Sequence, residues 1–128
     1  HSYYLIMNCD MPGFTKDESE IIANVARYHR KSHPKNSHQN YKKLSPEKKR
    51  IINILGGILR IAEGIDRRQI QLVKDIKVKH IAKEIKVTLI PSSGEAVLDI
   101  EIWGAERRKS LLELALKMDI KFEIYQQK

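Results

Sequence analysis

Residues 44–68 read LSPEKKRIINILGGILRIAEGIDRR and predict a helix from Pro46 to about Ile65. Ser45 is a typical helix N-cap, and proline suits the first helical position because a helix start leaves that N–H unpaired in any case. The Gly-Gly pair at 56–57 should destabilise this helix, since each glycine costs about 1 kcal/mol relative to alanine in a helix interior. We therefore expect a kink or a close contact with another helix at 56–57.

An apolar stripe runs along this helix and ends at an acidic residue. Leu55, Leu59 and Ala62 recur at helical spacing, and the next position of the stripe is Asp66. The sequence therefore predicts that Asp66 lies at the end of a buried helix face.

Another helix is predicted upstream, over about 16–30. Thr15 and Glu18 have the spacing of a capping box, in which each side chain binds the backbone N–H of the other residue. The apolar stripe of this helix, continued by one step, reaches His29, which is therefore expected to face inward. The stripe itself consists of Ile22, Val25 and Ala26.

After residue 71 the helical spacing gives way to an alternation of apolar and polar residues, which is typical of strands. Helical spacing returns at 105–117. We expect an α+β fold in which a helical lobe, 1–71, is followed by a small antiparallel-type α+β lobe, 72–128. The expected strands are 73–81, 83–91, 96–103 and 120–124, with a turn at 92–95 between two of them.

The positive charge of the chain is concentrated in one segment. The formal net charge is +8, and residues 27–50 hold nine Lys or Arg residues against a single acid, Glu47, so the rest of the chain is neutral. Such a localised field attracts polyanions, whether polyphosphate, nucleic acid or an acidic membrane surface. The plain alternative is a solvated loop whose charges only maintain solubility.

Arginines from both predicted helices could form one wall for phosphate oxygens, which a guanidinium group binds with two parallel hydrogen bonds. The alternative is a set of surface ion pairs, each worth less than about 1 kcal/mol. The candidate phosphate-binding residues are Arg27, Arg30, Lys31, Lys35, Lys42, Lys43, Arg67 and Arg68.

His29 and Asp66 form the candidate metal site. Two polar groups on buried helix faces need partners, because an unpaired buried polar group costs several kcal/mol. They could hydrogen-bond each other or the backbone, or they could bind a divalent metal that activates water for phosphate hydrolysis. Two ligands make an incomplete site, so the sequence leaves both alternatives open.

Several kinds of chemistry have no motif in this sequence. The single cysteine, Cys9, cannot form an internal disulfide or a thiolate zinc site. There is no glycine-rich phosphate loop, no nucleophile elbow and no HExxH motif. No apolar run reaches the roughly 20 residues that cross a bilayer, so we expect a cytoplasmic protein without membrane partners.

Four stretches of the chain carry a resemblance to a known family. They are HSYYLI (1–6), GFTKDESEIIANVARYHRKSHP (13–34), the opening stretch 44–68, and LDIEIWGAERRKSLLELALKMDIKFEI (98–124). Over nearly its whole length the chain resembles the C-terminal region of the exopolyphosphatase and guanosine pentaphosphate phosphohydrolase (Ppx/GppA) family. The motifs ARYHRK and RIAEGIDR are a fairly specific pair.

The resemblance implies that this chain is part of a longer protein whose catalytic and accessory domains are separate. In that family an actin-like N-terminal half carries the phosphate loops and the catalytic carboxylates. The C-terminal half holds a helical domain similar to HD-type metal phosphohydrolases and then a small α+β domain. The chain starts at His1, without a methionine, so we expect an accessory fragment with no catalytic residues of its own. Its expected partners are polyphosphate or guanosine pentaphosphate, the actin-like catalytic domains of the same chain, and a second copy in a homodimer.

The resemblance also bears on the candidate metal site. In HD-type hydrolases the metal is held by histidines, a His-Asp doublet and a final aspartate; His29 resembles one of the later histidines and Asp66 that final aspartate. The doublet would lie upstream of His1, which leaves an incomplete site for a divalent metal, Mg²⁺ or Mn²⁺ in the parent enzyme. Two alternative functions are an HD-type metal-dependent phosphohydrolase domain and a nucleic-acid-binding module, for which the sequence offers charge but only 6% aromatic residues.

Overall fold

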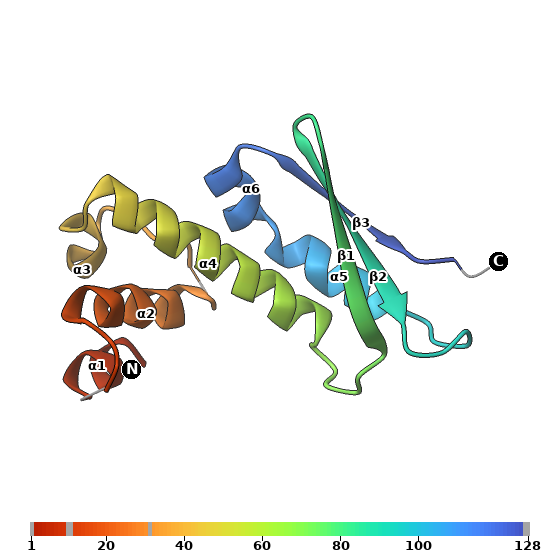
Figure 1. The fold of residues 1–128 in the computed structure, drawn as a ribbon, viewed down its shortest axis with the longest axis horizontal. Helices are drawn as coiled ribbons and strands as arrows, with labels where there is room; N and C mark the ends of the chain where they lie inside the picture. Colours follow the sequence, from red (N-terminus) through yellow and green to blue (C-terminus); the bar gives the residue numbers. More distant parts are fainter. Residues whose placement is uncertain (1, 10–11, 31, 127–128) are drawn as a thin grey trace.

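The computed structural model describes residues 2–9, 12–30 and 32–126, and these form six helices and one three-stranded sheet (Figure 1). The expected α+β fold class is confirmed. The elements are α1 (Ser2–Asn8), α2 (Lys16–Tyr28), α3 (Gln39–Lys42), α4 (Pro46–Ile65), β1 (Val73–Ile81), β2 (Glu84–Pro91), α5 (Asp99–Arg108), α6 (Ser110–Leu116) and β3 (Asp119–Ile124).

Helix α4 is the central element, and it begins and ends where the sequence predicts. The Ser45 hydroxyl accepts a hydrogen bond from the backbone N–H of Lys48 at 3.2 Å, so the predicted N-cap is confirmed. Helix α2 starts with the predicted capping box, because Thr15 and Glu18 bind each other's backbone N–H groups. Neither α4 nor any other helix of the described residues is long and apolar enough to cross a membrane.

Glycines of α4 let two other helices approach its backbone. A Cβ on Gly57 would lie 2.9 Å from the backbone N and Cα of Leu112 in α6, and a Cβ on Gly64 would overlap the carbonyl oxygen of Gly104 in α5. The close helix contact expected at 56–57 is therefore confirmed for Gly57. Gly56 makes no such approach, since its Cβ would lie 3.8 Å from the Leu111 side chain, an ordinary contact.

The buried face of α4 is not the one predicted. Leu55 and Leu59 are 45% and 40% exposed, and Asp66 is exposed, so the prediction of a buried Leu stripe is wrong. The helix turns its glycine side inward because only glycine permits the backbone contacts with α5 and α6. Its buried residues are Ile52, Gly56, Gly57, Arg60, Ile61, Gly64 and Ile65.

Two hydrophobic clusters share α4. Ile52 packs with Tyr28, Tyr41 and Leu44 among the first helices. A larger cluster joins Ile61 and Ile65 to the sheet and to α5 and α6, through Leu89, Leu98, Ala105, Leu112 and Ile120. Both clusters therefore depend on the same helix, and the division into lobes at residue 72 stays a prediction.

The sheet is mixed and not antiparallel throughout. Strands β1 and β2, both expected from the sequence, pair antiparallel as a hairpin, whereas β3 runs parallel to β2. A parallel partner requires a crossover of a dozen or more residues, which α5 and α6 supply. The expected strand 96–103 and the turn at 92–95 between strands are wrong: this segment leads into α5. The stretch LDIEIWGA (98–105) also places Leu98, Ile102 and Ala105 on one helix face.

A partly buried ion pair ties the α4–β1 connection to α5. Glu101 is 3% exposed and accepts hydrogen bonds from Arg68 Nε at 2.9 Å and from an Arg68 terminal nitrogen at 2.8 Å. Hydrogen bonding to Arg68 lowers the pKa of the Glu101 carboxyl, although burial opposes this. The pair fixes where the chain leaves α4.

We predict opposite effects for alanine at the two neighbouring glycines of α4. Gly56→Ala should raise the free energy of unfolding by up to about 1 kcal/mol, because it improves helix propensity without a close contact. Gly57→Ala and Gly64→Ala should lower it by about 1–3 kcal/mol, because the added methyl meets backbone that cannot move aside. Denaturant unfolding measures all three; equal shifts for Gly56 and Gly57 would contradict the packing.

We also predict a pH-dependent contribution from Glu101. Its folded-state pKa is lowered, so its stabilisation is present above the unfolded pKa and is lost as the pH falls through the folded pKa. Glu101→Gln should lower the free energy of unfolding at pH 7 by about 1–3 kcal/mol and should flatten its decline toward acid pH. Glu106→Gln, on the same helix in an exposed pair with Lys109, is the control and should change it by less than about 1 kcal/mol.

Candidate functional site

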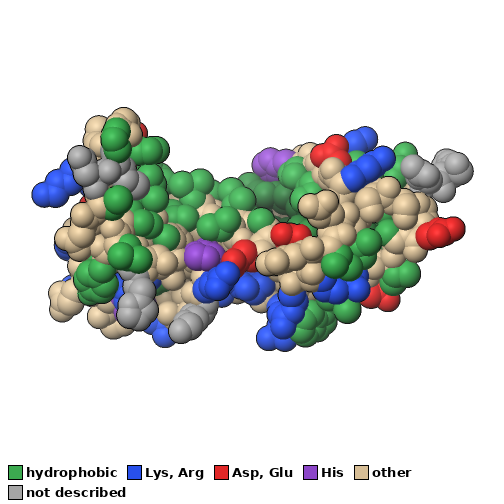
Figure 2. All heavy atoms as spheres, turned by 90° about the horizontal axis from the view of Figure 1, so that it is seen from below, with side chains coloured by type: hydrophobic (Ala, Val, Ile, Leu, Met, Phe, Trp, Pro, Cys, Tyr) green, Lys and Arg blue, Asp and Glu red, His purple; other side chains and the backbone are tan. Residues whose placement is uncertain are grey.

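A hollow lined by four arginines lies where the ends of α2 and α4 meet α5. Arg30 follows α2, Arg67 follows α4, and Arg107 and Arg108 end α5. We call this surface the arginine hollow. Figure 2 shows Lys and Arg side chains gathered in the middle of the face that is viewed from below. The other lining residues are Glu63, Gly64, Asp66, Gln69 and Gly104.

Glu63 of α4 organises one side of the hollow. Its Oε1 accepts hydrogen bonds from Arg30 at 3.2 Å and 3.0 Å, and its Oε2 lies 3.8 Å from an Arg108 terminal nitrogen. His29 Nε2 lies 3.7 Å from the same carboxylate. One acid therefore gathers three basic side chains from α5 and the end of α2.

Arg60 of α4, which lies outside the hollow, and Arg108 hold the end of α2 in place. Arg60 donates a hydrogen bond to the carbonyl oxygen of Tyr28 at 3.2 Å, and Arg108 donates one to the carbonyl oxygen of His29. Cations are favourable there because the last carbonyls of a helix carry partial negative charge. Burial and the nearby Arg108 lower the pKa of the Arg60 guanidinium. The end of α2, and with it Arg30, is thus positioned by α4 and α5.

Two of the arginines that line the hollow, Arg67 and Arg107, lie against an exposed aromatic residue. Trp103 of α5 is 47% exposed, and the guanidinium carbons of Arg107 and Arg67 lie 4.5 Å and 5.3 Å from its ring centre. No carboxylate of the described residues is within ion-pair distance of either guanidinium. No described carboxylate therefore neutralises these two arginines.

A neighbouring hollow continues from Arg30 toward α1. It is lined by Arg27, His29 and Arg30 at the end of α2 and by Tyr4 of α1, which is 64% exposed. The Arg27 guanidinium carbon lies 5.1 Å from the centre of the Tyr28 ring. The two hollows share Arg30 as a lining residue.

The predicted phosphate-binding residues fall into separate groups. Arg30 and Arg67 line the arginine hollow, and Arg27 lines the neighbouring one. Arg68 is engaged by Glu101, and Lys31 lies outside the described residues. Three lysines are exposed around α3, of which one is 3.8 Å from a Glu20 carboxylate oxygen. They are Lys35, Lys42 and, beside Glu20, Lys43.

The sequence did not single out Arg107 and Arg108. They lie in the part of the chain whose charges balance, so the concentration of charge at 27–50 directed attention away from them. The signal that could have found them is the spacing of Trp103 and Arg107, four residues apart, which places an aromatic ring beside a guanidinium on a helix.

The two candidate metal ligands line different hollows. His29 caps α2, and its Nδ1 lies 2.6 Å from the carbonyl oxygen of Ala26, while Asp66 caps α4 and lines the arginine hollow. The carboxylate beside His29 is Glu63, one helical turn before Asp66. Across residues 2–9, 12–30 and 32–126, no group of three or more His, Cys, Asp or Glu side chains is arranged to hold a metal ion.

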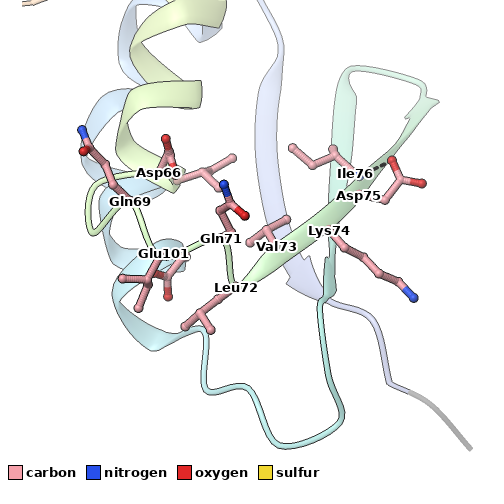
Figure 3. A pocket seen from close by; sticks show the side chains of 11 residues that line it. Asp66, Gln69, Gln71, Leu72, Val73, Lys74, Asp75, Ile76 and Glu101 are labelled. Carbon is pink, nitrogen blue, oxygen red and sulfur yellow. Dashed lines mark hydrogen bonds between the residues drawn. The ribbon is translucent and has the colours of Figure 1, made fainter.

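Asp66 also borders a further hollow below the α4–β1 connection. Figure 3 shows Asp66 and Gln69 from this connection and Glu101 from α5 among its lining side chains. Gln69 and Gln71 both have φ of 54°, which places them in the left-handed region that non-glycine residues rarely adopt. The chain turns at residues 66–68, directly after α4, and Asp66 and Arg67 are exposed there.

The comparisons with known proteins agree with the resemblance read from the sequence. The model of the family described as Ppx/GppA phosphatase, domain III, matches residues 1–116. A comparison with curated proteins gave no match. Because the match spans most of the chain and includes every residue that lines the arginine hollow, the chain belongs to the Ppx/GppA phosphatase family.

Proposed function

We propose that this chain is an accessory domain of an exopolyphosphatase-like phosphohydrolase and binds polyphosphate or another phosphate-rich anion, such as guanosine pentaphosphate. The observation that carries the proposal is the arginine hollow, where four guanidinium groups from three parts of the chain converge. Guanidinium groups bind phosphate oxygens with paired hydrogen bonds, and arginine remains charged at any physiological pH.

The arrangement of the arginines supports an anion that enters between them. Arg67 and Arg107 face Trp103, whereas Arg30 and Arg108 share Glu63. A phosphate would therefore bind the first pair directly and would compete with Glu63 for the second. The neighbouring hollow adds Arg27 beyond Arg30, which favours a chain of phosphates over a single phosphate group.

The basic segment 27–50 has a second role in the proposal. Lys35 and Lys42 are exposed around α3, outside the arginine hollow. Exposed charges of this kind raise the rate at which a polyanion arrives, and salt screens them beyond about 8–10 Å. We therefore assign attraction to the lysines and direct contact to the arginines.

The alternative of an HD-type metal centre has less support. His29 resembles metal-binding histidines in having Nδ1 at a backbone carbonyl, but its Nε2 lies 3.7 Å from a Glu63 carboxylate oxygen. However, the carboxylate beside it is already paired with Arg30, and Arg108 adds a further positive charge. The described residues do not fit a divalent metal here, so we derive no catalytic step from one.

We predict that the arginine hollow dominates polyphosphate binding. The double variant Arg67→Ala, Arg107→Ala should weaken the Kd at least tenfold, a loss of about 1.4 kcal/mol or more. In a plot of the logarithm of the association constant against the logarithm of the salt concentration, the steepness of the slope should decrease by about one unit for each phosphate contact removed. Isothermal titration with long-chain polyphosphate at several salt concentrations measures both.

Two matched double variants serve as controls for that experiment. Lys79→Ala, Lys121→Ala removes the same charge from exposed strand positions and should change the Kd less than threefold. Lys35→Ala, Lys42→Ala should slow association more than it speeds dissociation. If the strand variant weakens binding as much as the arginine variant, only net charge matters and the site assignment fails.

We predict that the purified chain releases no phosphate from polyphosphate. The catalytic carboxylates of the parent enzyme would lie in the actin-like domains, and the described residues hold no metal-binding cluster. Phosphate release is measured with and without added Mg²⁺ or Mn²⁺. Turnover that depends on metal and is lost in Asp66→Ala would instead support the HD-type hydrolase.

A further inference from the structure

Two exposed aromatic side chains near the hollows have no direct role in binding a chain of phosphates. Trp103 is 47% exposed and lies beside Arg67 and Arg107, two of the arginines that line the arginine hollow. Tyr4 is 64% exposed and lines the neighbouring hollow. Polyphosphate has no apolar or aromatic surface to place against either ring. An aromatic side chain beside a row of arginines suits a ligand with both phosphates and flat rings.

We propose that these two hollows bind a short single strand of RNA or DNA, with a base stacked at Trp103 and the sugar-phosphate backbone on the arginines. The proposal rests on the proposed function in one respect, that the arginines bind phosphate groups. Proteins that bind single strands without sequence preference combine a positively charged groove with aromatic stacking platforms. Both parts are present here on one face.

The electrostatics suit a backbone that passes over this face. Five arginines line the two hollows, against the two carboxylates of Glu63 and Asp66. Glu63 is already neutralised by Arg30 and Arg108, and Asp66 is exposed at the end of α4. A strand therefore meets a net positive surface along its length.

The contacts of Trp103 with Arg67 and Arg107 are compatible with the stacking of a base on its ring. An exposed cation–π contact is weaker than the stacking of a base on an aromatic ring, so a base can displace one guanidinium from the indole. The displaced Arg67 or Arg107 remains beside the base, where a phosphate follows. A base can also stack on the outer plane of a guanidinium that stays in place.

The length of the surface favours a strand over a single nucleotide. One nucleotide would occupy Trp103 and the adjacent arginines and would leave Arg27 and Tyr4 unused. The shared Arg30 makes the second hollow a continuation of the first, so a strand of several nucleotides can contact both exposed aromatic residues. Site sizes of about 4–16 nucleotides are typical of such surfaces.

The test uses the 128-residue chain and its single tryptophan, Trp103, as a fluorescent reporter. The probes are a ten-nucleotide oligouridylate, an abasic oligomer of the same length and charge, and polyphosphate of matched length. We expect the oligouridylate to quench Trp103 fluorescence and to bind at least fivefold more tightly than the abasic oligomer. Polyphosphate should bind with little quenching.

Variants separate stacking from charge. Trp103→Ala should weaken oligouridylate binding about 5- to 100-fold and polyphosphate binding much less, while Trp103→Phe should retain part of the affinity. Tyr4→Ala should cause a smaller loss. Tyr125→Ala, which removes another exposed aromatic residue beside a lysine on the sheet, is the matched control and should change nothing.

The outcomes distinguish the two proposals. Equal affinity for the abasic oligomer and the oligouridylate, or oligouridylate binding that Trp103→Ala leaves unchanged, would overturn the inference whatever polyphosphate does. Oligouridylate binding that depends on Trp103, without any binding of polyphosphate, would overturn the proposed function and leave base stacking standing. Because the abasic comparison uses the unaltered chain, the test does not depend on the variants folding.

Discussion

The backbones of α4 and α5 touch at Gly64 and Gly104, and the rest of the structure depends on this contact. A Cβ on either glycine would overlap the carbonyl oxygen of the other, so the two helices cross without side chains between them. The crossing forms the floor of the arginine hollow and brings Arg67, which follows α4, over Trp103 of α5. The same constraint that closes the core therefore assembles the candidate site.

The sequence predicted the elements whose signals are local. Caps located the starts of α2 and α4, and alternation located the β1–β2 hairpin. The sequence-based prediction chose the wrong buried face of α4. Glycine gives no hydrophobic signal, whereas Leu55 and Leu59, which are exposed, give a strong one. The prediction also misjudged the start of α5, because a short apolar alternation fits a strand and one helix face equally well. Long-range backbone packing decided both cases.

The candidate site was predictable only in part. Arg30 and Arg67 were found because they lie near the ends of two recognisable helices. Arg107 was missed because its contribution depends on what it lies beside in space, a tryptophan and no described carboxylate. Arg68 looked equivalent to Arg67 in the sequence. In the structure Arg68 is hydrogen-bonded to Glu101, whereas Arg67 is not. Neighbouring residues point in different directions, which charge counting cannot resolve.

The partner of an arginine decides whether its charge is available to a ligand. A carboxylate partner such as Glu101 orients the Arg68 guanidinium but also neutralises it. An aromatic partner orients a guanidinium through the electron-rich face of the ring and leaves the full positive charge in place. Trp103 therefore lets Arg67 and Arg107 be positioned without being neutralised, in a part of the chain whose sequence charges balance. The exposed tryptophan therefore orients two guanidinium groups without cancelling their positive charge.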